Sequence, residues 1–86
     1  MKSSHIEVRV GVEGVDVVAD DCEVFDYIDD FLTDRGLEFA FTREEECDGR
    51  RFYIMHFASD VAHESIANAL AGISEEEIER IWRLNN

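Results

Sequence analysis

The chain is 86 residues long and 45% hydrophobic, which suits one domain with a single small core. Its 21 acidic and 8 basic residues give a formal net charge of −13, which opposes non-specific binding to nucleic acid or to an anionic membrane. No apolar run approaches membrane-spanning length, and two cysteines without an apolar signal segment predict reduced thiols in a cytoplasmic protein. The charge favours a basic partner, although solubility or a salt-adapted source would account for it equally well.

Residues 6–18 predict the first two strands, because apolar residues alternate with other residues along them. We expect Glu13-Gly14 to turn the chain so that Val15 returns beside Val12, with the apolar side chains on a single face. The alternative is one long strand that bends at a glycine bulge.

A first helix is expected to follow Asp20, which can cap it together with Glu23 three residues later. Arg35-Gly36 supplies a cation and a glycine at the end of this helix. Its apolar residues at helical spacing are Val24, Ile28, Phe31 and Leu32, and Phe25 flanks them.

A second hairpin is predicted next. Residues 37–42 alternate as a half-buried strand does, and Asp48-Gly49 indicates a tight type I′ turn. The return arm, residues 51–58, is apolar at both parities and therefore resembles an inner strand. Opposite charges are expected to pair across the tip, Glu44, Glu45 and Glu46 with Arg50 and Arg51.

Two further helices are predicted in the C-terminal part of the chain. Ser59 or Asp60 is expected to cap the first of them, which ends at Gly72. Ser74 begins the second with a capping box, and Ile73 and Ile78 are placed to form a hydrophobic staple around it.

The predicted order of elements is therefore ββαββαα. Antiparallel hairpins interrupted by helices indicate an α+β two-layer sandwich, with a sheet of about four strands and the helices on one face. We expect residues 1–86 to form a single acidic domain of this kind. If residues 6–18 form one strand, the order becomes a ferredoxin-like βαββα followed by a C-terminal helix.

Carboxylates are most regularly placed on the first predicted helix. Asp26, Asp30 and Asp34 are spaced at i, i+4 and i+8, with Glu23 and Asp29 beside them. Like charges at this spacing repel, and acids near the C-terminal end of a helix oppose its dipole, so helix stability alone does not favour the arrangement. Such a row can imitate phosphates or dock onto a basic groove. The competing interpretation is a solvated helix face.

No pattern in the sequence predicts a metal, a cofactor or catalysis. The spacings CxxC, HxxxH and HExxH are absent, as are a glycine-rich phosphate loop and a GxSxG motif. A small two-layer domain also rarely encloses a pocket large enough for chemistry. We therefore expect a non-enzymatic protein without bound metal or cofactor.

The leading hypothesis is a small acidic binding module or inhibitor that docks its carboxylate-rich helix faces onto a basic protein, such as a nucleic-acid-binding protein or a toxin-like enzyme. It would not bind nucleic acid or membrane directly. One alternative is a homodimeric structural or assembly subunit, joined through a strand edge or through the last helix. The other is a regulatory domain that binds a small ligand or a cation. The candidate contact residues are Glu23, Asp26, Asp29, Asp30, Asp34, Glu75, Glu76 and Trp82.

Overall fold

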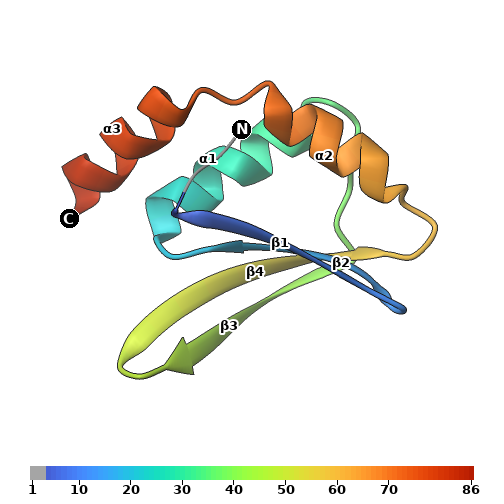
Figure 1. Cartoon of the computed structure of the whole chain (residues 1–86), viewed down its shortest axis with the longest axis horizontal. Coiled ribbons are helices and arrows are strands. Elements are labelled where there is room, and N and C mark those ends of the chain that lie inside the picture. Colours follow the sequence, from blue (N-terminus) through green and yellow to red (C-terminus); the bar gives the residue numbers. More distant parts are fainter. Residues whose placement is uncertain (1–3) are drawn as a thin grey trace.

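The computed structural model describes residues 4–86, which form one sheet covered on one side by three helices (Figure 1). The strands are β1 (Ile6–Gly11), β2 (Gly14–Ala19), β3 (Phe41–Cys47) and β4 (Arg50–Ala58). The helices are α1 (Cys22–Thr33), α2 (His63–Ala71) and α3 (Glu75–Asn85). The order ββαββαα and the α+β class predicted from the sequence are confirmed.

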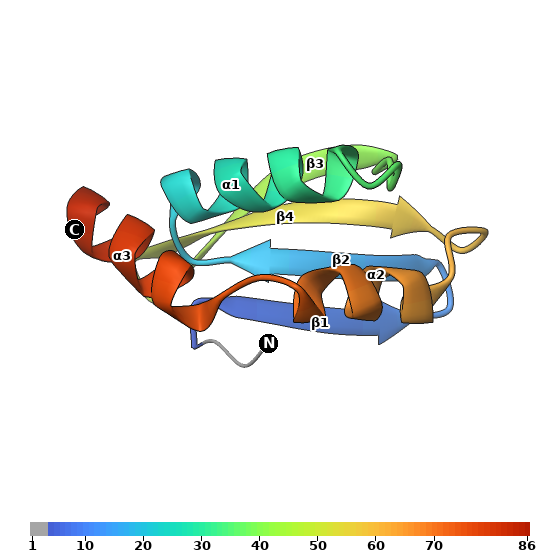
Figure 2. The same ribbon diagram turned by 90° about the horizontal axis from the view of Figure 1, so that it is seen from above.

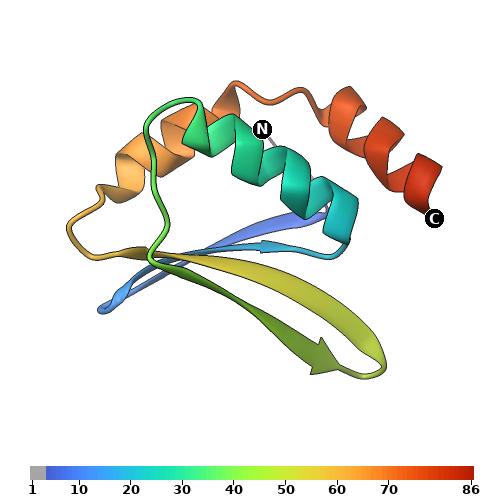
Figure 3. The same ribbon diagram turned by 180° about the vertical axis from the view of Figure 1, so that it is seen from behind.

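The four strands pair in the order β1-β2-β4-β3, and every pairing is antiparallel. Viewed from above the helices, α1 lies over the β4 side of the sheet and α2 over the β1 side (Figure 2). The β3–β4 hairpin extends beyond the helical layer (Figure 3). One face of the sheet therefore carries the core, while the other face and the outer part of this hairpin have no helix over them.

The core lies between the sheet and the helices, as the alternating strand pattern requires. Its strand residues include Val15, Val17, Met55 and Phe57. Its helix residues include Val24, Ile28 and Leu32 of α1, Ile66 and Leu70 of α2, and Ile78 of α3. These helical residues recur at intervals of four within α1 and α2, so each helix turns one apolar stripe inward.

The first hairpin forms, but its register differs from the prediction. Gly11 pairs with Gly14, so the turn residues are Val12 and Glu13 rather than Glu13-Gly14. Gly14 already belongs to β2 at φ +137°, and a Cβ there would collide with the carbonyl oxygen of Phe57 in β4. The glycine is therefore needed for a close approach between strands, not for the turn.

The second hairpin confirms the predicted turn and corrects one strand boundary. Asp48 and Gly49 have φ angles of 52° and 77°, as a type I′ turn requires, and Cys47 pairs with Arg50 across it. The first arm starts only at Phe41. The two earlier apolar residues of the predicted strand, Leu37 and Phe39, pack against the core from the connecting loop instead.

Two of the three predicted helix caps are wrong. Asp21, not Asp20, caps α1 by accepting hydrogen bonds from the backbone of the next residues. Ala62 is the N-cap of α2 and makes no side-chain cap, so neither Ser59 nor Asp60 has that role. The prediction for α3 is confirmed, because the Ser74 hydroxyl accepts a hydrogen bond from the backbone N–H of Glu77.

Candidate docking surface

The outward face of α1 collects the carboxylates that the sequence singled out. Helical spacing turns Val24, Ile28 and Leu32 into the core, so the opposite side of the helix faces solvent. The exposed acids on that side are Glu23, Asp26, Asp30 and Asp34. Asp29 is half-buried and accepts a hydrogen bond of 3.2 Å from the Thr33 hydroxyl.

These α1 carboxylates are not neutralised within the part of the chain that the structure describes. Glu23, Asp26, Asp30 and Asp34 form no ion pair with any of residues 4–86, and Asp29 forms none either. We call these five residues the α1 acidic face.

The arginines lie elsewhere. Among residues 4–86, six of the seven arginines pair with a carboxylate, and none of these pairs involves the α1 acidic face. The pairs are Arg9–Glu7, Arg43–Asp16, Arg50–Asp20, Arg51–Glu44, Arg80–Glu77 and Arg83–Glu79. The seventh, Arg35, follows α1 and lies 3.4 Å from the centre of the Phe31 ring. No arginine among residues 4–86 therefore forms an ion pair with the α1 acidic face.

Pairing at the tip of the β3–β4 hairpin follows the prediction only for Arg51. Its guanidinium lies 3.8 Å from Glu44 and 4.0 Å from Glu46. Arg50 instead reaches Asp20 at 3.5 Å, because its side chain lies on the sheet face without helices.

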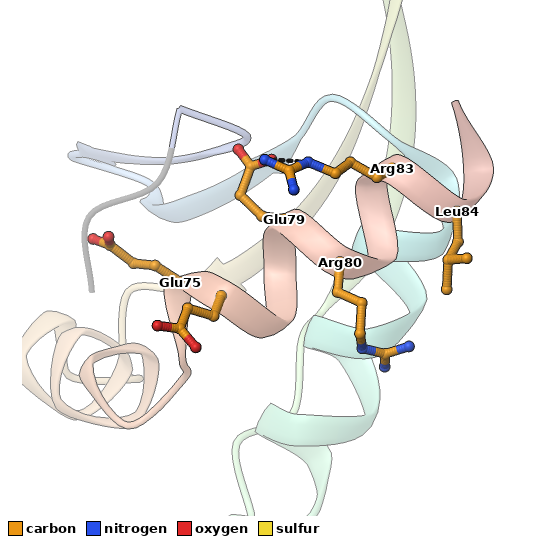
Figure 4. A pocket seen from close by; sticks show the side chains of 6 residues that line it. Glu75, Glu79, Arg80, Arg83 and Leu84 are labelled. Carbon is orange, nitrogen blue, oxygen red and sulfur yellow. Dashed lines mark ion pairs between the residues drawn. The ribbon is translucent and has the colours of Figure 1, made fainter.

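Glu75 and Glu76 belong to α3 and not to the α1 acidic face. They begin α3 and line a shallow hollow on its outer side (Figure 4). Arg80 and Arg83 line the same hollow, and Arg83 pairs with Glu79 at 3.5 Å. This hollow therefore has mixed charge and contains an ion pair, whereas no carboxylate of the α1 acidic face forms an ion pair within residues 4–86.

Trp82 contributes to the domain itself. Its indole packs against the core cluster and stacks on the His5 ring at a centroid distance of 4.7 Å. The two nitrogens of His5 lie 3.0 Å from carboxylate oxygens of Asp20 and Glu79. This cluster joins α3 to the sheet. Burial by itself would lower the pKa of His5, but the hydrogen bonds to both carboxylates outweigh burial and raise it.

A second polar cluster lies on the sheet face without helices. His56 Nδ1 is 2.7 Å from Asp16, and Arg43 donates to the same carboxylate at 2.9 Å. Phe41 stacks on the His56 ring at 4.7 Å. Burial opposes the charge of Asp16, yet the hydrogen bonds from Arg43 and His56 prevail, and the pKa of Asp16 is lowered. The cluster links β2, β3 and β4.

Sequence reasoning missed both clusters. Asp16 and His56 stand directly opposite each other on neighbouring strands, so a correct strand register would have predicted their contact. No comparable signal existed for His5 and Glu79, which are 74 residues apart in the chain.

Within residues 4–86, no group of three or more His, Cys, Asp or Glu side chains is arranged to hold a metal ion. No helix of this part of the chain is long and apolar enough to cross a membrane.

Fold and surface together define a small α+β sandwich that carries one helix face of unpaired carboxylates. No family model, curated protein or solved structure matches this chain.

Proposed function

We propose that this protein is an acidic binding module or inhibitor that docks the α1 acidic face onto a basic protein surface. The observation that carries the proposal is the lack of ion pairs on this face, since its five carboxylates are unpaired while six of the seven arginines in residues 4–86 pair with other acids. Cations spaced among these acids would stabilise α1, whereas neighbouring acids repel one another, so helix stability does not account for the arrangement.

The cap and the packing of α1 support this role. Asp21 caps its first turn, and the side-chain amides of Asn85 and Asn86 bind the same carboxylate from the end of α3. The apolar stripe of α1 is buried in the core. A rigid helix loses little conformational entropy on binding, so more of the electrostatic attraction contributes to affinity.

The chemistry of the partner follows from that of the face. Carboxylates spaced along one side of a helix attract arginine and lysine side chains, and long-range attraction between opposite charges speeds association. A nucleic-acid-binding protein whose groove normally holds phosphates, or a toxin-like enzyme with a basic active site, has the required surface. Direct binding of nucleic acid is disfavoured by the net charge of −13.

We place this activity in the cytoplasm. Cys22 and Cys47 are both free thiols. Free thiols persist in a reducing compartment, whereas secreted domains of this size usually contain disulfides.

The test compares two triple variants that change the net charge equally. D26N/D30N/D34N removes charge from the α1 acidic face. The control E13Q/D60N/E64Q removes the same charge from exposed residues that form no ion pair within residues 4–86. Binding of an arginine-rich peptide, and capture of proteins from native lysate, are measured at low and at high salt.

We expect the α1 variant to bind the peptide and any captured protein at least tenfold more weakly than the control, mainly through slower association. Its remaining binding should depend less on salt, because fewer ion pairs are screened. Equal binding by the two variants would reject the α1 acidic face as the interface. A salt-insensitive complex would reject the electrostatic mechanism.

A further inference from the structure

The open edge of β1 exposes more apolar surface than the rest of the sheet. Val8 is 36% exposed, Val10 is 61% exposed and Val12, at the hairpin tip, is 98% exposed. They are three of the five large hydrophobic residues exposed in the described chain. Val8 and Val10 stand opposite buried valines of β2, so they lie on the core side of the sheet. The apolar core therefore extends to the open edge of the sheet at Val8 and Val10.

The two edge strands of the sheet differ in the number of charged residues that they carry. The other edge strand, β3, carries a run of charged residues from Arg43 to Glu46. Such runs prevent an edge from pairing with another chain, because self-pairing would place like charges opposite one another. β1 has only one acid and one base, Glu7 and Arg9, between its apolar residues.

The backbone of β1 is directed so that its open edge can pair. The carbonyl oxygen of His5 accepts a 3.2 Å hydrogen bond from the N–H of Asp20, so His5 directs its backbone toward the β2 side. Backbone groups alternate between the two edges along an antiparallel strand. Ile6, Val8 and Val10 therefore direct their N–H and C=O groups to the open edge.

We propose that two copies of this chain pair antiparallel through β1, about a two-fold axis at Val8, and join their four-stranded sheets into one. In this register Val8 faces Val8 of the second copy and Ile6 faces Val10 of the second copy. These are the residues whose backbone groups point outward, so about six hydrogen bonds close the junction. Their side chains continue the core across it.

The charges of β1 are self-complementary in the same register. Glu7 stands opposite Arg9 of the second copy, on the sheet face without helices. Within one chain these two side chains already pair at 3.2 Å while remaining half-exposed, so they are free to exchange partners across the junction. The symmetry creates two such pairs in each dimer.

The junction lies away from the α1 acidic face. The α1 acidic face lies over the β4 side of the sheet, and α2 is the helix over the β1 side (Figure 2). α2 carries a single acid, Glu64. The two-fold axis therefore keeps the α1 acidic faces of the two copies apart. This inference does not depend on the partner proposed for α1.

Sedimentation of the full chain tests the dimer directly. We expect the mass to rise with concentration from 9.9 kDa toward twice that value. Amide hydrogen exchange at Ile6, Val8 and Val10 should slow as the dimer forms. The amides of Glu7 and Arg9 already face β2 and should not change. A mass that stays at 9.9 kDa over the whole soluble range would overturn the proposal.

Charge exchange tests the register. E7R places two arginines opposite two arginines, and R9E places two glutamates opposite two glutamates, so each variant alone should be monomeric. Mixed in equal amounts, they should form a heterodimer, because every cross-strand pair becomes complementary. The double variant E7R/R9E should dimerise like the wild type.

A matched control separates this effect from net charge. E13R changes the net charge as E7R does, but Glu13 lies in the turn outside the paired segment, and the variant should still dimerise. Dimers of E7R alone or of R9E alone would overturn the register, and so would a mixture that remains monomeric.

Discussion

Replacing Asp21 with alanine should loosen two helices at once. The residue is 5% exposed and is a buried acid between α1 and α3. Its carboxylate accepts hydrogen bonds from the backbone N–H groups of Glu23 at 3.0 Å and Val24 at 3.1 Å. It also accepts from the side-chain amides of Asn85 at 2.6 Å and Asn86 at 2.9 Å.

The magnitude follows from these two groups of contacts. Loss of an N-cap costs about 1 kcal/mol. The two amide contacts contribute about 0.5–1 kcal/mol each, because both asparagines are exposed and water can replace the lost acceptor. The free energy of unfolding should thus fall by about 2–3 kcal/mol out of the ~4–13 kcal/mol typical of a chain of this length. A fall of that size lowers the melting temperature by about 10–20 °C.

Urea titration followed by circular dichroism is the assay. D26A is the matched control, since Asp26 lies exposed on the same helix and forms no ion pair within residues 4–86, and its effect should stay within about 0.5 kcal/mol. A double-mutant cycle of D21A with N85A should show coupling, because both changes remove the same contact. If D21A lowers the free energy of unfolding no more than D26A does, the conclusion that Asp21 connects α1 to α3 is refuted.

Acid should reduce the difference between wild type and D21A. Burial alone would raise the pKa of Asp21, but hydrogen bonds from Asn85, Val24, Asn86 and Glu23 lower it. A carboxyl whose folded pKa is lowered stabilises the protein above its unfolded pKa, and this stability is lost as the pH falls through the folded value. The two unfolding free energies should therefore converge below about pH 4.

Two further variants test the contacts of His5 and the turn at Gly49. Because the pKa of His5 is raised, its contribution to stability is present below the ordinary histidine pKa of about 6.5 and is lost as the pH rises through the folded value. H5Q should therefore remove a loss of stability that the wild type shows as the pH rises above about 6.5. An H5Q protein with an unchanged stability–pH profile would contradict the contacts of His5 with Asp20 and Glu79. Separately, G49V should lower the melting temperature, because a β-branched residue resists the φ of 77° at this turn, and an unchanged value would contradict the type I′ geometry.

The order of elements could be predicted because local signals agreed with tertiary packing. The turn at Asp48-Gly49 and the cap at Ser74 each need only neighbouring residues, and both are present in the structure. The register of the first hairpin could not be predicted in this way. Gly14 resembles a turn residue in the sequence, but its role is set by the passage of β4 beside it.

Competition between adjacent acids explains the error at the start of α1. Asp20 and Asp21 are equally plausible caps from the sequence. The choice is made by distant residues, because Asp20 binds His5 and Arg50 while Asp21 binds the asparagines at the end of α3. Such contacts leave no local pattern.

Only part of the candidate site could be predicted from the sequence. Helical periodicity is enough to place Asp26, Asp30 and Asp34 on one outward face, and the structure places them there. It is not enough to show where the arginines pair. The pairing of the arginines with acids outside the α1 acidic face depends on strand pairings and on helix neighbours, and these become visible only in the folded chain.

The two proposed surfaces reinforce each other. A two-fold axis through the open edge of β1 runs perpendicular to the joined sheet, so the helices of both copies lie on the same side. α2 of each copy then lies near the junction, and each α1 lies farther out (Figure 2). The dimer would present two acidic faces in a fixed geometry, and a basic partner long enough to reach both would bind with avidity beyond either face alone. A partner that contacts one face only would gain nothing from dimerisation. Comparing the E7R chain with wild type therefore distinguishes an extended basic partner, whose binding weakens in the monomer, from a compact one, whose binding does not.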